Sequence, residues 1–344
     1  MDIEKIKTQF IGTQLKEDIF SNSIEGLLLL KKGAVLDDTH IELLLNHKVE
    51  ISSLTFISEA TEALSADKAY LSIFKKVEET FASLIDKSEE GLEDLLSDYK
   101  TLIDLALSDI TMLDIILNDT HPITSNPIYK HSINVGIISA LIGQVLGYSS
   151  KNCHLLSQMG LFHDIGMLLI KEEILNKKTK LTHSEYKEIQ KHTTLGKSIL
   201  FSINSLDIII SRTALLHHEK INGNGYPFNR QEKDIPFMIQ IISVADIFNS
   251  MCSAVWHQKK KTYFETINEL IDEAHGNALN PAIVIPFVSY LMRKQLFNKV
   301  KLSTEQTAEI IFIHPNEPNL PLVRIDDDYL DLRKTASIKI VAPT

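Results

Sequence analysis

The chain has 344 residues, of which 44% are hydrophobic and 23% are charged, as in ordinary globular proteins. It contains 35 Lys and Arg against 45 Asp and Glu, which gives a formal net charge of −10. A surface this acidic argues against binding to nucleic acid or to an anionic membrane face. The N-terminus lacks a signal-peptide core, no apolar run could span a bilayer, and the two cysteines lie far apart. We therefore expect a cytoplasmic protein without a membrane anchor or a disulfide framework.

Residues 1–57 predict a small mixed α/β unit, because a chain of this length usually divides into several folding units. An apolar run at residues 27–30 is typical of a short strand. The run Asp37-Asp38-Thr39 can cap a helix that passes through Ile41, Leu44 and Leu45. Residues 49–56 predict another strand, with Val49 and Ile51 facing inward.

Residues 58–117 predict two or three helices. Leu71, Phe74 and Val77 recur at helical spacing, and Leu92 and Leu95 do so later in the segment. We expect these helices to connect the first unit to the rest of the chain or to form the contact of a homodimer.

Residues 118–297 predict a mostly helical domain, which holds almost all the histidines that could carry chemistry. The tail, residues 298–344, predicts a small β meander packed on that domain. The expected fold class is therefore mainly α, with an α/β unit before the helices and a β segment after them. The strand-like runs of the tail are residues 310–313, 322–325, 329–332 and 338–341.

Several His and Asp residues of the helical segment stand out. His131 lies on the apolar face of its predicted helix, and Asp246 follows Ile239 and Ile242 at spacings that point its carboxylate into the core. Burying an unpaired carboxylate is very costly, so Asp246 needs a cation or strong donors. The other candidates are His163, Asp164, His192, His217 and His218.

Each candidate has an ordinary explanation when it is taken alone. A lone inward histidine is usually a core residue, and a buried aspartate can cap a helix or pair with Lys or Arg. Together, the histidines and aspartates form a ligand set that suits iron, manganese or zinc. Asp164 is the natural bridging ligand because a carboxylate has two oxygens, while His163 beside it can serve one metal. Two metals about 3.5–4 Å apart can clamp a phosphoryl group from both sides.

The order of these residues resembles the HD-GYP branch of the HD phosphohydrolase superfamily. HDIG stands at residues 163–166, and HHEKINGNGYP at residues 217–227 is similar to the branch pattern HHExxDGxGYP. LTHSEYKEIQKH at residues 181–192 resembles the branch's Leu-Thr, Glu and His run. IPFMIQIISVADIFNSM at residues 235–251 resembles the segment that delivers its last aspartate. The resemblance covers about residues 120–295.

The resemblance implies an all-helical bundle that hydrolyses a cyclic dinucleotide, chiefly cyclic di-GMP. It implies two divalent metal ions, iron or manganese rather than zinc, with His163 and Asp164 as catalytic residues. Pro127 stands where some members have a glutamate for a third metal. The implied metal ligands are His131, His163, Asp164, His192, His217, His218 and Asp246.

The loop at residues 223–227 would border the substrate cleft, since its glycines allow close approach of the backbone. Tyr226 could stack on a base or bond to a phosphate, or it could simply pack within a tight turn. The implied substrate contacts in this loop are Asn222, Gly223, Gly225 and Tyr226.

The chain departs from the branch pattern mainly at cationic positions. Met167 replaces a usual Lys and Asn222 a usual Asp, while Gln240, Val255 and Gln258 stand where the branch usually has Arg or another cation. Each lost charge-assisted contact should weaken phosphate binding by about 1.5–3 kcal/mol. Replacements could come from the basic run Lys259, Lys260 and Lys261, which could equally be a solvated turn.

Three functions remain compatible with the sequence. The first is a phosphodiesterase that acts on cyclic di-GMP, which the complete ligand set favours. The second is the same hydrolytic site with another phosphoester substrate. The third is a metal-bearing receptor or scaffold with little turnover, which the lost cations favour.

Overall fold

The computed structural model describes residues 10–343, except residues 12, 24–27, 32, 52–53, 55, 58, 109–112, 114–115, 117–125, 178, 254–259 and 336–337. The chain divides into two compact units, Met1–Ala69 and Tyr70–Thr344. The protein is mainly helical, as the sequence predicts. In the part of the chain that is described, no helix combines the length and the apolar character needed to cross a membrane.

The described residues of the first unit form two small antiparallel sheets and helix α2 (Asp38–Asn46), and α3 (Glu59–Ile85) begins at the end of this unit. Strand β1 (Gln14–Leu15) pairs with β4 (Phe56–Ile57), and β2 (Ile19–Phe20) pairs with β3 (Leu28–Leu30). Helix α2 begins where the Asp37 side chain accepts a hydrogen bond from the amide of His40, as the cap prediction required.

The predicted strand at residues 49–56 is wrong for its described residues 49–51 and 54, because strand β4 comprises Phe56–Ile57. Val49 and Ile51 are nevertheless buried, at 7% and 2% exposure, as predicted. They follow the turn that ends α2, where the amide of Val49 donates to the carbonyl of Leu44. At residues 49–51 the alternation of apolar residues therefore indicates which side chains are buried, although these residues do not form a strand.

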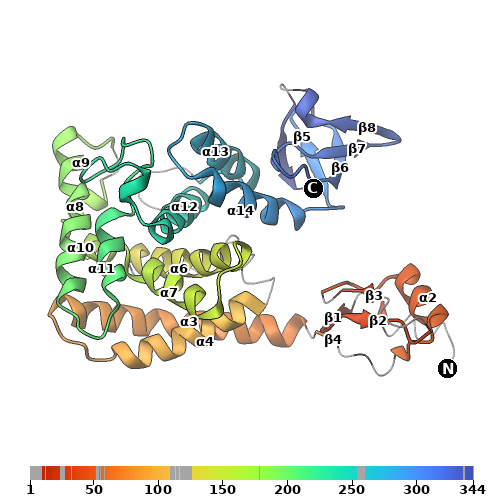
Figure 1. Cartoon of the computed structure of the whole chain (residues 1–344), viewed down its shortest axis with the longest axis horizontal. Coiled ribbons are helices and arrows are strands. Elements are labelled where there is room, and N and C mark those ends of the chain that lie inside the picture. Colours follow the sequence, from red (N-terminus) through yellow and green to blue (C-terminus); the bar gives the residue numbers. More distant parts are fainter. Residues whose placement is uncertain are drawn as a thin grey trace. The chain divides into compact units, whose positions relative to one another are not determined.

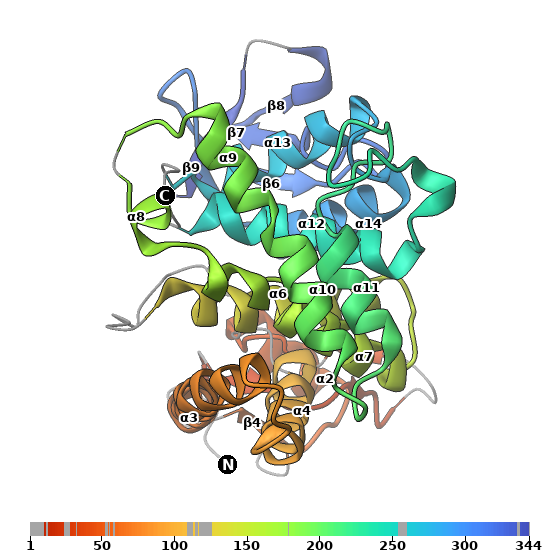
Figure 2. The same cartoon turned by 90° about the vertical axis from the view of Figure 1, so that its left-hand side faces the viewer.

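Two long helices open the second unit, α3 (Glu59–Ile85), which belongs to it from Tyr70 onward, and α4 (Leu92–Ser108). They pack on α6 and α7 (Figures 1 and 2). Phe81 of α3 contacts Phe162 of α7 with ring centroids 5.5 Å apart. The Tyr99 hydroxyl of α4 donates to the carbonyl of Ile133 in α6. Much of the apolar surface that predicted a connector or dimer contact is thus covered within the chain, although Leu71 is 48% exposed. Dimerisation through these helices stays a prediction.

Helices α6 (Pro127–Val145) and α7 (Ser150–Phe162) lie at the centre of the helical domain and carry part of the site themselves. These two approach closely because Gly136 and Gly160 face each other, and a Cβ on Gly160 would lie 2.7 Å from the Cα of Gly136. In Figure 2, α10 and α11 run side by side in front of this pair. The further helices of the described part of this unit are η2 (Ile165–Leu169), α8 (Glu172–Leu175), α9 (His183–Gln190), α10 (His192–Phe201), α11 (Ile208–Leu216), η3 (Glu232–Asp234), α12 (Phe237–Cys252), α13 (Tyr263–His275), α14 (Pro281–Arg293) and, in the tail, η4 (Leu332–Lys334).

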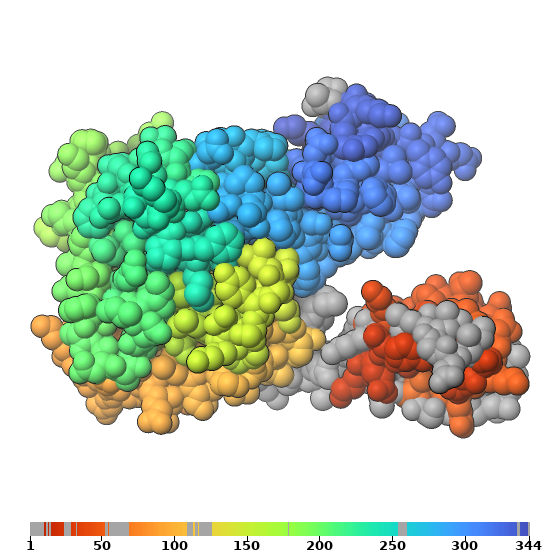
Figure 3. Space-filling view, viewed as in Figure 1, coloured from red at the N-terminus to blue at the C-terminus, as the bar shows by residue number. Residues whose placement is uncertain are grey.

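The tail forms one antiparallel sheet, whose last strand contacts α13. In the space-filling view the tail lies against the C-terminal part of the helical domain (Figure 3). Its strands are β5 (Lys299–Leu302), β6 (Thr307–Phe312), β7 (Leu322–Ile325), β8 (Asp328–Asp331) and β9 (Ile340–Pro343). The order β8-β7-β6-β5-β9 is a meander whose final strand returns to pair with β5. The prediction of a small β segment is confirmed, although β5 was not among the predicted runs.

Candidate metal centre

Seven residues from five segments of the second unit converge in the helical domain. His131 lies on α6 and Asp246 on α12, whereas the others stand at the ends of helices. Helix ends are favourable positions for ligands, because the chain changes direction there and side chains from different helices can point toward one place. His163 follows α7, Asp164 precedes η2, His192 begins α10, and His217 and His218 follow α11.

Asp164 lies between two pairs of histidines. Its Oδ2 lies 3.7 Å from Nε2 of His131 and 3.7 Å from Nε2 of His163. Its Oδ1 lies 3.3 Å from Nε2 of His192 and 3.4 Å from Nε2 of His217. One carboxylate oxygen therefore faces each pair, which is the arrangement that a carboxylate shared by two metals requires.

Asp246 closes the cluster on the side of α12. Its Oδ1 lies 3.1 Å from Nε2 of His131 and 3.9 Å from Nε2 of His163. Its Oδ2 lies 3.8 Å from Nδ1 of His218, which is the most exposed of the five histidines. The Ser250 hydroxyl, one turn later on α12, donates to Asp246 Oδ1 over 3.1 Å.

Three of the buried histidines are oriented by backbone carbonyls. Nδ1 of His163 lies 2.6 Å from the carbonyl oxygen of Gly160, and Nδ1 of His192 lies 2.6 Å from that of Ile189. Nδ1 of His217 lies 3.1 Å from the carbonyl oxygen of Thr213. Because a carbonyl can only accept, each Nδ1 carries the hydrogen, and each neutral ring therefore offers the lone pair of Nε2 to the cluster.

The charges of the cluster fit a divalent cation. Nε2 of His163 and Oδ1 of Asp164 are buried without a hydrogen-bond partner among the described residues. Burial lowers the pKa of the His163 imidazole to about 4, so this ring is neutral near pH 7. Burial alone would raise the pKa of Asp164, but the nearby His163 and His192 outweigh it and hold that pKa well below its usual range. Neutral imidazoles and ionised carboxylates are the ligand states that metals bind.

Overlapping groups of ligand atoms, each within 4.8 Å of one another, could hold a metal ion. The groups are Asp164, His192, His217 and His218; His131, His163 and Asp164; and His163, His217 and Asp246. Asp164 thus belongs to two of these groups, one with each pair of histidines.

A cleft of about 260 Å³ opens onto the cluster. Its far wall is apolar, formed by Met167, Leu175, Leu181 and Ile189. Met167 is buried there in a small hydrophobic cluster. Among the described residues that line the cleft, none is Lys or Arg.

Two tyrosines complete the cleft. Tyr226 stacks on His218, with ring centroids 4.6 Å apart and planes inclined by 29°. Tyr186 of α9 meets Tyr226 edge to face at 6.3 Å and is 46% exposed. An aromatic surface therefore runs from the histidines to the rim of the cleft.

The loop that carries Tyr226 is held from inside by Glu219. This carboxylate is 3% exposed and accepts hydrogen bonds from the amides of Phe228 and Arg230 over 2.7 and 2.8 Å. A Cβ on Gly225 would lie 2.3 Å from the amide nitrogen of Lys220, so only glycine fits at this position.

The other predicted substrate contacts of this loop shape its turn. Asn222 Oδ1 accepts from the amide of Asn224, and Asn222 Nδ2 donates to the carbonyl of Gly276. Gly223 adopts a φ of 78°, a left-handed conformation that favours glycine. Within the described part of the chain, the cleft lining includes Tyr226 but not Asn222, Gly223 or Gly225.

The predicted replacement cations differ in their placement. Lys259 lies outside the described residues, as do Val255 and Gln258. Lys260 is exposed, and the ammonium group of Lys261 pairs with Glu269 over 2.9 Å. The described lining of the cleft includes neither Lys260 nor Lys261.

Gln240 has a structural role that the sequence did not indicate. Its side chain donates to the carbonyl of Ile235 and accepts from Asn280 Nδ2, both over 2.8 Å. It thereby ties the start of α12 to the start of α14, away from the cleft.

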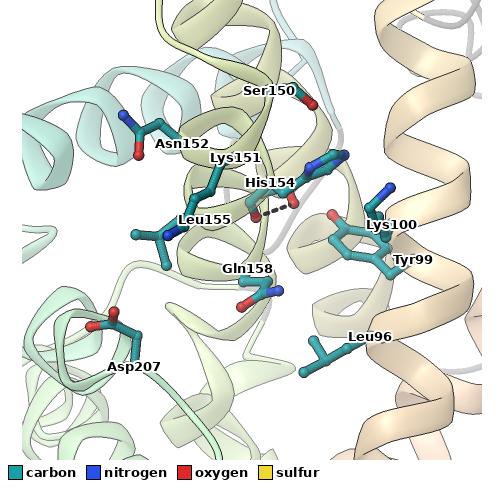
Figure 4. A pocket seen from close by; sticks show the side chains of 11 residues that line it. Leu96, Tyr99, Lys100, Ser150, Lys151, Asn152, His154, Leu155, Gln158 and Asp207 are labelled. Atoms are coloured by element: carbon teal, nitrogen blue, oxygen red, sulfur yellow. Dashed lines mark hydrogen bonds between the residues drawn. The ribbon is translucent and has the colours of Figure 1, made fainter.

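A larger hollow of about 530 Å³ lies elsewhere, on the outer face of α7 against α4 (Figure 4). Its histidine, His154, has Nε2 2.6 Å from Asp104 Oδ1. Lys100 pairs with the same Asp104 over 2.8 Å. Both side chains thus pair with Asp104, whereas the groups of His and Asp ligand atoms found among the described residues lie at the smaller cleft, so the chemistry assigns the site there.

Sequence reasoning assigned no role to Glu219, Asn249 or Ser250. Glu219 had a signal, since it follows the two adjacent histidines. Asn249 and Ser250 lie three and four residues after Asp246, where a helical side chain shares its face. The carbonyls of Gly160, Ile189 and Thr213 are backbone groups, so no residue type could have marked them.

Comparisons with known proteins agree with this chemistry. A family model described as an HD domain matches residues 111–283. The chain is similar to a cyclic di-GMP phosphodiesterase of Thermotoga maritima, with 30% identity over 202 residues, which are 58% of this chain and 52% of that protein. It is also similar to the 3'3'-cGAMP-specific phosphodiesterase 3 of Vibrio cholerae, with 35% identity over 121 residues, 35% of this chain and 26% of that protein.

The chain spans about half the length of the first of these relatives. Among solved structures, the fold is similar to that of an HDG"Y"P protein from Bdellovibrio bacteriovorus. The TM-score is 0.56 at 18% identity, and the match covers 82% of this chain and 96% of the other. At this identity the likeness concerns the fold alone.

Proposed function

Because the chain belongs to the HD domain family, we propose that it is a metal-dependent phosphodiesterase that hydrolyses a cyclic dinucleotide, with cyclic di-GMP as the first candidate. The observation that carries the proposal is the position of the Asp164 carboxylate, which turns one oxygen toward each pair of histidines. Two divalent ions, when bound, supply Lewis-acid stabilisation of a phosphodiester transition state and activation of water at neutral pH.

The residues divide into two sets around Asp164. His131, His163 and Asp246 would hold one ion, and the other would be held by His192, His217 and His218. Asp164 would be shared, since its two oxygens face the two sets. Imidazole and carboxylate ligands suit iron and manganese, which we propose ahead of zinc.

The cleft supports a substrate that carries bases. Tyr186 and Tyr226 offer aromatic surface at its rim, and base–aromatic stacking contributes about 1–3 kcal/mol per base. Apart from these tyrosines, Ser250 and the His and Asp residues of the metal centre, the described lining of the cleft is apolar. The phosphate would therefore be attracted by the metal centre, while the walls would bind the bases.

A second candidate is the same reaction with another cyclic dinucleotide or a different phosphoester. Met167 favours it, because an apolar side chain lines the cleft where the HD-GYP pattern has a lysine. The similarity to a 3'3'-cGAMP-specific relative gives this candidate a definite substrate to test.

The deciding experiment measures turnover of cyclic di-GMP and 3'3'-cGAMP by protein purified anaerobically and reconstituted with Fe(II) or Mn(II). Metal content is determined on the same sample. We expect about two ions per chain, and faster turnover of cyclic di-GMP. Preference for 3'3'-cGAMP would select the second candidate. Full metal occupancy without turnover of either compound would contradict both of these substrates and favour a different phosphoester or a receptor role.

A further inference from the structure

His131 differs from the other buried histidines of the cluster in the group that orients it. His163, His192 and His217 hold backbone carbonyls at Nδ1, whereas Nδ1 of His131 lies 2.9 Å from the side-chain Oδ1 of Asn249. Asn249 is 1% exposed and belongs to α12, which packs against the helix of His131. This is the one orientation among the four that a side-chain substitution can change.

An amide side chain can serve His131 in two opposite ways. If its oxygen faces the ring, Nδ1 carries the hydrogen, and Nε2 keeps a lone pair toward Asp164 and Asp246. If its NH₂ group faces the ring, Nδ1 must accept, and the hydrogen moves to Nε2, where it blocks a metal. The structure has the oxygen at the ring, and Nδ2 of Asn249 has no partner among the described residues.

We propose that Asn249 is a positioning residue of the metal centre, which fixes His131 in the tautomer whose Nε2 can bind a metal ion. The inference depends on the metal centre of the proposed function but not on the substrate. Asn249 contacts His131 at Nδ1, the ring nitrogen remote from the cluster, so its effect reaches the metal ion through His131 alone. Partners of this kind typically change metal affinity by about 10–100-fold.

A neutral partner also has an electrostatic consequence. The cluster already contains two buried carboxylates, Asp164 and Asp246. The Asn249 amide orients His131 without adding a third negative charge, so the loaded centre keeps more of its positive charge. This matters for an anionic substrate, because the described walls of the cleft carry no Lys or Arg.

The test compares three variants of the full chain by Mn(II) titration. Asn249→Leu removes the acceptor at similar volume, and we expect the affinity for Mn(II) to fall about 10–100-fold. Asn249→Asp keeps an acceptor at the same place, and we expect wild-type or tighter binding. Gln240→Leu is the matched control, because it also removes a buried side-chain amide from α12. The Gln240 amide contacts Ile235 and Asn280 instead of a histidine. This variant should bind Mn(II) as the wild type does.

A second readout follows the tautomer itself. In Zn(II)-loaded protein with ¹⁵N-labelled histidine, the protonated nitrogen of His131 should be Nδ1 in the wild type and in Asn249→Asp. Its Nδ1–H signal should shift or disappear in Asn249→Leu. If Asn249→Leu does not fold, Asn249→Asp decides, because a carboxylate cannot donate to Nδ1 and a donor role for Asn249 predicts weaker binding.

Unchanged Mn(II) affinity in Asn249→Leu would overturn the proposal, as would equal losses in Gln240→Leu or weaker binding in Asn249→Asp. These outcomes are independent of turnover. A wild type that binds metal but hydrolyses no cyclic dinucleotide would defeat the proposed function alone and leave this inference standing.

Discussion

Gly166 lies directly against the backbone carbonyl of His192, so closely that a Cβ on Gly166 would be 2.0 Å from that oxygen. The same Cβ would be 2.5 Å from the amide nitrogen of Gly196, one turn later on α10. This contact sets the distance between η2, which follows Asp164, and the helix that begins with His192. The glycine of the HDIG motif therefore has a packing function for the metal centre.

Gly166→Ala should force α10 away from η2, because backbone atoms cannot move aside as a flexible side chain does. We expect a loss of about 1–3 kcal/mol in the free energy of unfolding, together with weaker Mn(II) binding. Urea denaturation and metal titration measure the two effects. The control is Gly276→Ala, where the nearest atom to the added Cβ is 3.4 Å away, an ordinary contact. Wild-type metal affinity in Gly166→Ala would show that the contact does not position His192.

Asp164→Asn should remove both metal ions. The amide cannot supply two anionic oxygens, and each oxygen of Asp164 faces a different pair of histidines. Elemental analysis of protein reconstituted with Mn(II) should give far less than one ion per chain. Asp207→Asn is the control, since Asp207 caps α11 at its first turn and an asparagine caps equally well. Retention of one full ion in Asp164→Asn would contradict the shared role.

Tyr186→Ala should weaken substrate binding and leave the metal centre intact. The ring lies at the exposed rim of the cleft beside Tyr226, so it can reach a base without contacting a metal ligand. Loss of one stacked base predicts a rise in KM of roughly 5- to 150-fold, with kcat and metal content nearly unchanged. Tyr186→Phe keeps the aromatic ring and should behave as wild type. A fall in kcat at constant KM would argue against stacking at this position.

Cys252 should make stability depend on alkaline pH. Burial raises the pKa of its thiol from 9.0 to about 11, so the folded state keeps the proton when the unfolded state has lost it. The contribution of the protonated Cys252 thiol to the free energy of unfolding is fully present below about pH 9. It decreases as the pH rises toward 11, because the unfolded chain then binds fewer protons than the native one. Wild type should lose roughly 2 kcal/mol more than Cys252→Ala between pH 8 and pH 10.5. Urea unfolding of both proteins at the two pH values tests this, and parallel losses would contradict it.

Much of the fold follows from periodicity in the sequence. Phe74, Val77 and Phe81 repeat at helical spacing, and α3 does run through them. Residues 322–325 predict a strand and coincide with β7. The failure at residues 49–56 has a physical reason, since Val49 and Ile51 bury their side chains from a turn. Alternation encodes which side chains are inside, whereas strand pairing depends on a partner elsewhere in the chain.

The candidate site was predictable where side chains carry the chemistry. His131 and Asp246 are 115 positions apart, yet their types and their apolar surroundings marked both. Cations were harder to interpret from the sequence. Gln240 occupies a position read as a lost phosphate contact, but its amide joins α12 to α14 through Asn280. Whether Lys259 reaches the cleft stays a prediction, because it lies outside the described residues.

The carbonyls behind His163, His192 and His217 have a consequence for comparing related proteins. A backbone oxygen is present whatever residue occupies the position, so these three ring orientations persist through sequence drift as long as the helices keep their ends. Position 249 is different, because there the orientation of His131 depends on residue identity. Among proteins with this centre, differences in metal preference that arise behind His131 should therefore follow the residue at position 249.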